Sequence, residues 1–490
     1  MSFGFGFALP AYPLRGGGGN NPFNQLGPTL DLSFVDGATN VGDQLGPDTY
    51  TLNTDFTTPE YQVAAQYAVW ESGVGLAQKT FSQIVTFTRA STATYFNSAG
   101  TLTTAAINEA RFDYDPSTLA LRGFLIEEAR TNSIRNNTMV GAVAGTPGTL
   151  PTNWSVTTSL TGITREIVGT GTESGITYID IRLSGTPSGA GTYLFLNETS
   201  TAVAALTGQT WTNSAYFKLQ AGSLAGVTSV RLYFQENNSG GSYLTEQNTT
   251  VTNPTAAALS TQRASATRTL NQATTAFLMP GFNLLLTGAA IDVTLRIGLP
   301  QLEQGAFATS VIPTTTTALT RSADVASVNT LSPWYNQSAM TFYAEYAPIY
   351  TASATVPSNT PHVLQVYNTA VSTNNYGIRG VEPSLNQVFV ARNPTIGAQF
   401  PAVALGSYGQ AGVVRKLGYA INSSDLQPAV NGALGTMLSN NVAALMAVHD
   451  KMDIGSGTGG SPPYQLNGWL RRITYYPRRL PNADLQTITA

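Results

Sequence analysis

Hydrophobic and polar residues alternate with a period of two over most of the chain from residue 83 onward. Clear examples occur at residues 177–183, 214–218, 230–235 and 291–297, and clusters of Gly, Pro, Asn and Ser separate such segments. This alternation predicts β-strands with one buried face, and many short strands joined by such turns predict sandwiches or barrels. We therefore expect an all-β protein built from tandem β-sandwiches.

Strand parity in the middle of the chain predicts which side chains face inward. One parity gives the expected core: Ile179, Ile181, Leu183, Leu232, Phe234, Ile291, Val293, Leu295 and Ile297. The other parity leaves a face that carries Tyr178, Asp180, Arg182, Tyr216, Lys218, Arg231, Tyr233, Gln235 and Arg296. A pyranose suits such a face, because its C–H surface packs on an aromatic ring and its hydroxyls meet charged hydrogen-bonding groups. We predict that glycan is bound by Tyr178, Arg182, Tyr216, Arg231, Tyr233 and Arg296. The alternatives are a solvated sheet face or a subunit interface.

Helix signals occur at residues 57–71. Thr58 can cap a helix, Pro59 fits its first turn, and Gly73 follows its expected end. We predict one short helix here, packed against its own domain or against another subunit.

The first residues form an arm in which aromatic residues alternate with small ones. Phe3, Phe5, Phe7 and Tyr12 precede a glycine run at residues 16–19, which predicts a flexible tether. We predict that these aromatic residues anchor the chain to a partner; the alternative is a disordered tail.

Composition restricts the classes of function. Charged residues make up 10% of the 490 residues, the net charge is -3, and no long basic run is present. This excludes nucleic acid and an anionic membrane as primary partners. The chain has no cysteine, and no stretch reaches the about 20 apolar residues that span a bilayer. We expect assembly in a cytoplasm.

Acidic residues provide the only candidates for glycan hydrolysis, which needs two convergent carboxylates. Glu127 and Glu128 are adjacent, so on a strand they point to opposite faces, and Arg130 is expected to pair with one of them. Asp113 and Asp115 share a parity, but Asp115 starts a predicted turn. We expect structural roles for all four and no enzymatic activity.

Metal and aromatic sites are less defined. His362 and His449 lie in separate segments without metal-ligand spacing, which argues against a zinc site. Calcium is compatible with sandwiches of this kind, but no loop identifies its ligands, and no other cofactor is expected. Among the tryptophans, Trp154 and Trp211 are possible sugar platforms, with Trp211 expected in the core. Trp334 and Trp469 are expected to be buried.

Several segments resemble tail or head fibre (spike) proteins of tailed bacteriophages. The first block is FTRASTATYFNSAGTLTTAA, ARFDYDPSTLALRG and FLIEEARTN, within residues 85–132. Residues 150–312, which end in GLPQLEQGAFATSVIP, resemble the carbohydrate-binding jelly-roll modules that follow this block. Residues 326–490, with KLGYAINSSDLQPAVNG, MDIGSG and LNGWLRRITYYPRRLPNADL, resemble concanavalin A-like or laminin-G-like lectin domains.

The resemblance implies a domain plan and a function. We expect an anchoring arm and linker at 1–56, a helix with the fibre block at 57–135, a jelly roll at 136–312 and a lectin-like domain at 313–490. The implied function is adhesion of a virion to host cell-surface polysaccharide, as a homotrimer that contacts other virion proteins through its arm. A capsid-attached head fibre, a polysaccharide depolymerase and a purely structural spacer are the alternatives.

Overall fold

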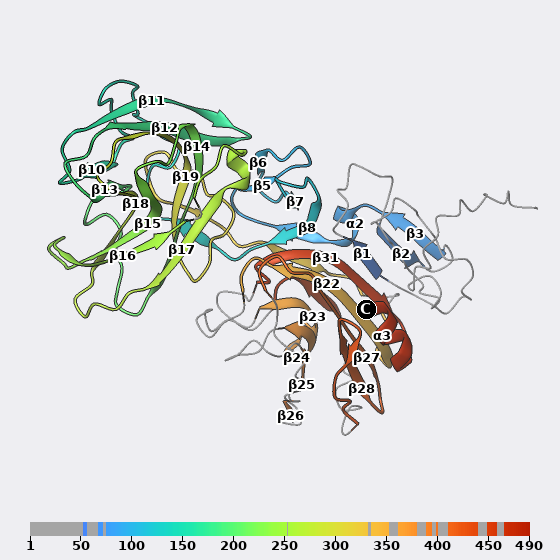
Figure 1. Ribbon diagram of the computed structural model, residues 1–490. Coiled ribbons are helices and arrows are strands. Elements are labelled where there is room, and N and C mark those ends of the chain that lie inside the picture. Colours follow the sequence, from blue (N-terminus) through green and yellow to red (C-terminus); the bar gives the residue numbers. More distant parts are fainter. Residues whose placement is uncertain are drawn as a thin grey trace, which may run out of the picture.

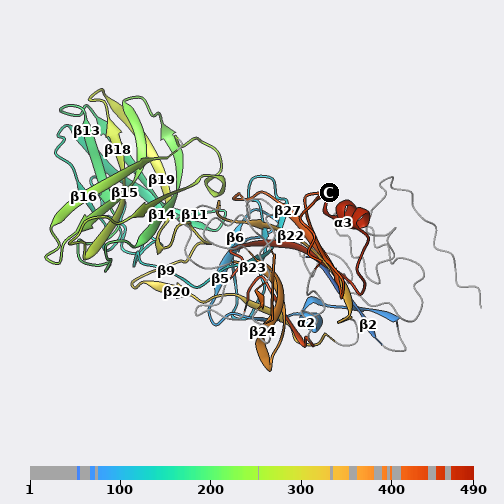
Figure 2. The ribbon, with the colours of Figure 1, turned by 90° about the horizontal axis from the view of Figure 1, so that it is seen from below.

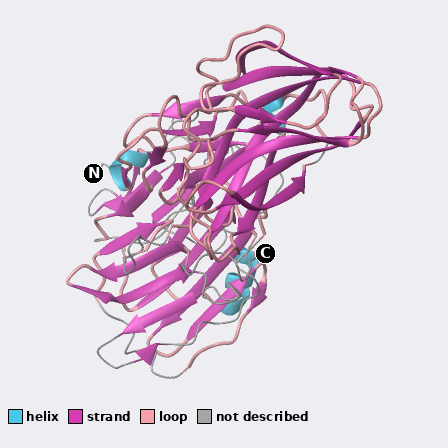
Figure 3. Cartoon of the chain, turned by 90° about the vertical axis from the view of Figure 1, so that its left-hand side faces the viewer, coloured by secondary structure: helices cyan, strands magenta, loops and turns pink. Residues whose placement is uncertain are grey.

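The computed structural model describes residues 52–55, 67–71, 75–251, 253–331, 335–351, 361–379, 389–393, 398–399, 410–439, 448–457 and 465–490. Strands dominate this part of the chain, and it forms two β-sandwiches that lie side by side (Figures 1 and 3). The predicted all-β class is confirmed. The anchor residues Phe3, Phe5, Phe7 and Tyr12 lie outside the described residues, as does Trp334.

The central sandwich consists of two five-stranded antiparallel sheets. The first sheet has the order β10 (Ser155–Thr157), β13 (Gly191–Leu196), β18 (Phe277–Leu286), β15 (Val227–Asn237) and β16 (Tyr243–Thr250). The second has the order β11 (Ile163–Glu173), β12 (Ile176–Gly185), β19 (Ile291–Gln304), β14 (Thr210–Gly222) and β17 (Arg263–Thr269). The strands predicted from alternation are thus confirmed.

The core between these sheets follows the predicted parity. All the aliphatic and aromatic residues assigned to it are buried in one cluster, from Ile179 on β12 to Ile297 on β19. Phe195 and Phe282 stack within it with ring centroids 4.9 Å apart, and Trp154 and Trp211 are buried beside them. Burial of this apolar surface, at roughly 25 cal/mol per Å2, is the main stabilising contribution in the sandwich.

The terminal sandwich packs a ten-stranded sheet on a seven-stranded one. The larger sheet contains β29 (Ala433–Leu434), β28 (Leu426–Val430), β27 (Arg415–Asn422), β22 (Ala339–Pro348), β31 (Gly468–Tyr476), β1 (Leu52–Asp55), β2 (Tyr67–Glu71), β3 (Gly75–Lys79), β8 (Leu121–Ile126) and β7 (Phe112–Tyr114). The smaller contains β26 (Ala398–Gln399), β25 (Phe389–Asn393), β24 (Val371–Arg379), β23 (His362–Asn368), β30 (Lys451–Ile454), β21 (Val325–Val328) and β4 (Thr86–Thr88). The helix α3 (Asn482–Thr489) follows β31 and covers β27 and β28.

Local turn chemistry explains the hairpin between β28 and β29. Asn431 and Gly432 have φ angles of 44° and 78°, the left-handed region that a two-residue hairpin turn requires. Asn-Gly is a dipeptide that favours such a turn, and the structure has one here.

The fibre block (residues 85–132) adds strands to both sheets of the terminal sandwich. Its strand β4 pairs with β21, and β8 pairs with β31, so both complete sheets of the terminal sandwich. The chain then leaves through β9 (Arg130–Asn132), builds the central sandwich, and returns through β20 (Leu319–Arg321). β9 and β20 pair with each other and form a two-stranded ribbon between the two sandwiches (Figure 2).

The helix predicted at residues 57–71 is wrong where the structure describes it. Residues 67–71 form β2, which pairs with β1 and β3. Helical turns occur instead at α2 (Phe81–Ile84) and at the short 3-10 segment η1 (Leu259–Thr261). The side chain of Gln83 accepts a 2.8 Å hydrogen bond from the backbone N–H of Thr80 at the start of α2. None of the described helices has the length and apolar character needed to cross a membrane.

One hairpin of the fibre block leaves the terminal sandwich and packs on the central one. It consists of β5 (Ala93–Phe96) and β6 (Leu102–Ala105), and Figure 1 shows it between the two sandwiches. The backbone N–H of Leu102 donates to Ser174 O at 2.9 Å, and the Thr94 hydroxyl donates to Val311 O at 2.5 Å. The hairpin therefore covers one end of the outer face formed by β12, β19 and β14.

A candidate binding cavity between the two sandwiches

The predicted glycan face does not exist as one surface. Tyr178, Arg182, Tyr216 and Arg296 lie on the sheet that contains β12, β14 and β19, whereas Arg231 and Tyr233 lie on β15 of the opposite sheet. Each group does face away from the shared core. The two outer faces lie on opposite sides of the sandwich, so the six residues cannot contact one ligand.

Tyr216 is buried, contrary to the prediction that it is exposed. Only 2% of its surface is accessible, because it packs with Leu102 of the β5–β6 hairpin and with Leu299 and Val311. Tyr178 lies beside it and is half-buried. A residue of the fibre block, far away in sequence, thus covers this part of the face.

Arg182 and Arg296, the two predicted arginines on this outer face, are paired with acids. The guanidinium of Arg296 lies 3.5 Å from the ring centroid of Tyr178 and forms ion pairs with Asp180 at 2.8 Å and Glu173 at 2.5 Å. Arg182 pairs with Asp292 at 2.8 Å and with Glu166 at 3.3 Å. The positive charges of Arg182 and Arg296 are therefore neutralised by acidic residues on β11, β12 and β19 of the same sheet.

Tyr233 is also buried, at 2% exposure, and its predicted exposure is wrong. It packs with Leu196 and Met279 of neighbouring strands, and its hydroxyl donates to Gln235 Oε1 at 2.8 Å. Burial raises the pKa of Tyr233, and the nearby carboxylate of Glu246 raises it further. On the same face, Arg231 Nε donates to Asn283 Oδ1 at 2.8 Å.

A cavity of about 230 Å3 lies where the hairpin, the central sandwich and the terminal sandwich meet. Its lining comes from β5, β6, β7, β8, β14, β17, β31 and the segment after β19: Tyr95, Phe96, Leu102, Asp113, Arg122, Leu125, Glu127, Tyr216, Arg263, Ser265, Ala308, Thr309, Ser310, Val311, Ile349 and Trp469. Aromatic rings and charged groups therefore share one small space.

Trp469 forms part of the terminal sandwich's side of the cavity. Its indole Nε1–H donates to Asp113 Oδ2 at 2.8 Å, and the guanidinium of Arg122 lies 4.9 Å from the centre of its ring. Asp113 Oδ1 accepts a second hydrogen bond, from the backbone N–H of Phe96 at 2.8 Å. These contacts fix the indole, and Trp469 is partly exposed rather than buried as predicted.

Arg263 provides a positive charge on the side of the central sandwich. Its guanidinium lies 5.7 Å from the ring centroid of Tyr216, donates to Thr309 O at 2.7 Å and donates to Ser214 Oγ at 3.0 Å. The ion pairs of the described residues include none for Arg263. Its Nε is buried and without a hydrogen-bond partner among these residues.

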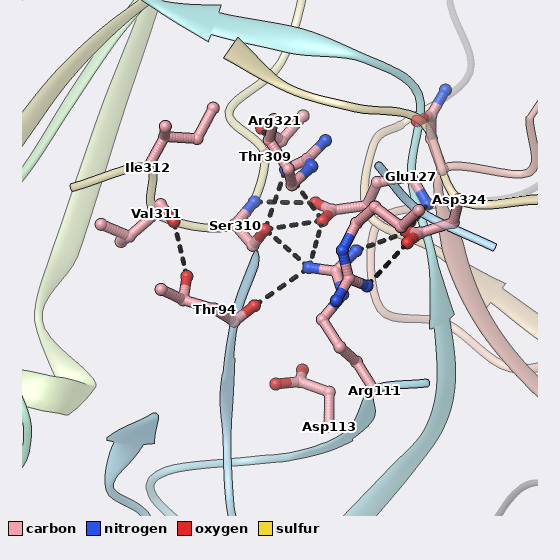
Figure 4. A network of polar contacts seen from close by, with 12 residues as sticks. Thr94, Arg111, Asp113, Glu127, Thr309, Ser310, Val311, Ile312, Arg321 and Asp324 are labelled. Carbon is pink, nitrogen blue, oxygen red and sulfur yellow. Dashed lines mark hydrogen bonds and ion pairs between the residues drawn. The ribbon is translucent and has the colours of Figure 1, made fainter. Parts of the chain in front are cut away.

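Glu127 lines the cavity and belongs to a buried network of charges (Figure 4). Glu127 pairs with Arg111 at 2.8 Å and with Arg321 at 3.0 Å, and it accepts a 2.6 Å hydrogen bond from the Ser310 hydroxyl. Asp324 pairs with Arg111 at 2.5 Å and also with Arg89, at 3.0 Å. Ser310 belongs to the segment that leaves the central sandwich, so the network joins the two units.

The pKa of Glu127 reflects this network. Burial alone would raise the pKa, but the charges of Arg321 and Arg111 and the hydrogen bonds from Ser310 lower it to about 2. Glu128, by contrast, pairs with Arg130 at 2.5 Å, as one of the two glutamates was predicted to do.

The two candidate aspartates also hold structural positions. Burial raises the pKa of Asp113 even though Phe96, Arg122 and Trp469 favour its charged form. Asp115 accepts hydrogen bonds from the backbone N–H groups of Ser117 and Thr118, which confirms the predicted turn. Across the described parts of the chain, acidic and histidine side chains do not gather in threes to hold a metal ion.

Sequence reasoning missed Tyr95, Arg122 and Arg263 as site residues and assigned Trp469 to a buried position. Asp113, Arg122 and Trp469 stand within the motifs that carry the resemblance, which was the available signal. Arg263 has no such signal, because its role depends on a contact between separate units.

Comparison with protein-family models gives no match, and comparison with curated proteins gives none. Among solved structures, the chain is similar to the CBM40 module of Ruminococcus gnavus IT-sialidase bound to alpha2,3 sialyllactose, with 16% identity over 32% of this chain and 84% of that one, at a TM-score of 0.26. It is also similar to the CBM22-1–CBM22-2 tandem of Paenibacillus barcinonensis Xyn10C, with 11% identity over 70% and 96% of the two chains and a TM-score of 0.21. Trypanosoma rangeli sialidase in complex with sialic acid gives 10% identity over 65% and 61%, at a TM-score of 0.25. Scores this low carry no argument about ligand or activity.

Proposed function

We propose that this chain is an adhesive structural protein of a tailed-bacteriophage virion, a fibre or spike that binds glycans of the host surface. The observation that carries the binding part is the cavity in which the partly exposed Trp469 lies among hydrogen-bonding groups. Indole presents an apolar face to a sugar ring, and guanidinium and hydroxyl groups bind sugar hydroxyls. The virion part rests on the sequence motifs.

The size of the cavity favours one sugar residue over a longer chain. Its volume of about 230 Å3 lies below the roughly 300–1,000 Å3 of pockets that enclose drug-sized ligands. A site that contacts only one sugar unit of a glycan binds it weakly. A homotrimer that presents several such cavities to a repetitive surface would gain affinity through effective concentration.

Binding without hydrolysis is part of the proposal. Glu127 is held by two guanidinium groups, Glu128 is paired with Arg130, and Asp115 caps a turn. The pKa of Asp113 is raised by burial, but both of its oxygens accept hydrogen bonds, from Phe96 N–H and from the Trp469 indole, and these hold it in a structural position. A glycosidase needs one carboxyl group that remains protonated near neutral pH and a second one positioned to act with it. A depolymerase would release reducing ends from host polysaccharide, and a pure spacer would bind no glycan.

Blocking the cavity tests the binding function without removing a contact. Ser265 lines the cavity and is exposed, and Thr267, two residues along the same strand, is exposed but lies outside it. We expect Ser265→Trp to abolish binding of the purified chain to an array of bacterial surface glycans, because the indole would fill the space.

The matched control is Thr267→Trp, which adds the same side chain to the same sheet face and should bind as the wild type does. Melting temperatures of both variants check that the fold is kept. Equal binding by Ser265→Trp and wild type would place the glycan site elsewhere.

A further inference from the structure

The two carboxylates that line the cavity are both engaged by donors of the protein. Both carboxylate oxygens of Asp113 accept hydrogen bonds, from Phe96 N–H and from the Trp469 indole. Both oxygens of Glu127 are also engaged, one by the backbone N–H of Ser310 at 2.7 Å and the other by guanidinium groups and the Ser310 hydroxyl.

The backbone carbonyls of the lining are occupied as well. Thr309 O accepts from Arg263, Ser310 O accepts from Gln301 at 3.3 Å, and Val311 O accepts from Thr94. Each of these carbonyls is therefore engaged by at least one donor of the protein.

Arg263 retains unused donors. A guanidinium has five N–H groups, and the Thr309 and Ser214 contacts use one each at two of its nitrogens. Its charge has no ion-pair partner among the described residues, and the aromatic ring of Tyr216 lies beside it. Planar guanidinium groups bind carboxylates through two parallel hydrogen bonds, and these are stronger than contacts to neutral hydroxyls.

We infer that the cavity selects sugars that carry a carboxylate, such as hexuronic acids, and that Arg263 binds this carboxylate. The inference rests on the proposed glycan binding and specifies its ligand class. An acidic sugar would supply the charged partner that Arg263 does not have among the described residues, while the sugar ring packs near Trp469. Arg122 contributes less to selection, because it already pairs with Asp115 at 2.8 Å.

The test compares two ligands that differ at one carbon. Methyl glucuronide carries a carboxylate where methyl glucoside carries a hydroxymethyl group. We expect the wild-type chain to bind the glucuronide at least about tenfold more tightly, as measured by calorimetric titration or saturation-transfer NMR. Added salt should reduce that difference, because the contact is between charges.

Variants of Arg263 identify the residue responsible. Arg263→Gln should remove the preference for the acid, and Arg263→Lys should restore part of it. The control is Arg165→Gln, since Arg165 also donates to backbone carbonyls, those of Pro147 and Gly148, but lies outside the cavity lining. This control should keep the preference.

The outcomes separate this inference from the proposed function. Equal binding of both sugars would overturn the selection of acids and leave glycan binding intact. Binding of neither sugar, nor of any array glycan, would overturn both. A preference that survives in folded Arg263→Gln, or disappears equally in Arg165→Gln, would show that Arg263 does not read the carboxylate.

Discussion

The carboxylate of Glu127 is balanced by guanidinium groups that have no access to water. Arg111 and Arg321 are buried, and the negative charge of Glu303 also stabilises the charged form of Arg321. Such groups are stable in the interior only while each charge keeps its partners. A substitution that removes one charge and keeps the shape should therefore be costly.

Glu127→Gln should lower the free energy of unfolding by about 3–5 kcal/mol, because two guanidinium groups would lose a charged partner in the interior. Urea denaturation measures this directly. The control is Glu166→Gln, since Glu166 and its partner Arg182 have side chains 37% and 41% exposed. That variant should lose at most about 1 kcal/mol. Similar small losses in both variants would contradict a dominant role for the buried network.

His449 should make the stability dependent on pH. Burial lowers its pKa from 6.5 to about 4, despite the opposing charge of Asp450. The unfolded chain therefore binds the proton more readily than the folded chain does. The contribution of His449 is complete above about pH 6.5 and is lost as the pH falls toward 4, by at most about 3 kcal/mol.

Denaturation midpoints at about pH 7 and about pH 4.5 provide the measurement for His449. The loss on acidification should be smaller in His449→Gln, which cannot take up the proton. Parallel pH profiles of variant and wild type would show that other groups cause the loss. Glu127 has a folded pKa of about 2 and an ordinary value of 4.5, so it also begins to lose its stabilising contribution near pH 4.5. That loss is common to the variant and the wild type, and the difference between their profiles therefore reports His449.

Residue-level reasoning from sequence had a clear limit. The alternation along each strand correctly predicted which side chains of the central sandwich face its core, from Ile179 to Ile297. It also showed that Tyr216 and Tyr233 face away from that core, but not that other residues cover them. Burial of an outer face depends on contacts that a strand's own pattern does not contain.

At the scale of elements, the β5–β6 hairpin closes the cavity because its backbone approaches β11 and β12 closely. Gly175 lies at the turn between these strands with a φ of +78°, and a Cβ there would be 2.0 Å from Leu102 O. Only glycine fits this contact. The motifs of the family resemblance include this segment, but they do not show which sheet the hairpin contacts.

Gly175→Ala should displace the hairpin. Gly208→Ala is the matched control, because Gly208 has a similar φ of +85° but no atom within 4 Å of the added Cβ. Both changes carry backbone strain of about 1 kcal/mol. Only Gly175→Ala should also speed hydrogen exchange at the Leu102 amide, which donates to Ser174 O. Equal exchange rates in the two variants would show that the hairpin tolerates the added methyl group.

The incorrect prediction of a helix at residues 57–71 shows that hydrogen bonding between strands can outweigh the helix propensity of the local sequence. Residues 57–71 contain a cap, a proline and alanines, all of which favour helix in isolation. Residues 67–71 nevertheless pair with β1 and β3. Backbone hydrogen bonds to strands on both sides determine the structure there, and helix propensity differs by only about 1 kcal/mol per residue.

At the scale of the whole molecule, the cavity could not be derived from any single segment. Tyr95, Tyr216, Arg263 and Trp469 come from the hairpin, from the central sandwich and from the terminal sandwich. Sequence patterns describe each sandwich well because its strands alternate. They carry no information on which loop of one sandwich meets which strand of the other.

The β9–β20 ribbon gives the central sandwich the form of an exchangeable cassette. Its two ends leave the terminal sandwich as neighbouring strands, so recombination could substitute another module without separating the flanking chain. The buried ion pairs around Glu127 restrict the position of the downstream recombination junction. Thr309 and Ser310 complete the shell around Arg321 and Glu127, so a productive junction lies upstream of them. A crossover at Leu319 would import foreign residues into that shell, so an exchange that preserves the fold should keep this short stretch with the recipient chain.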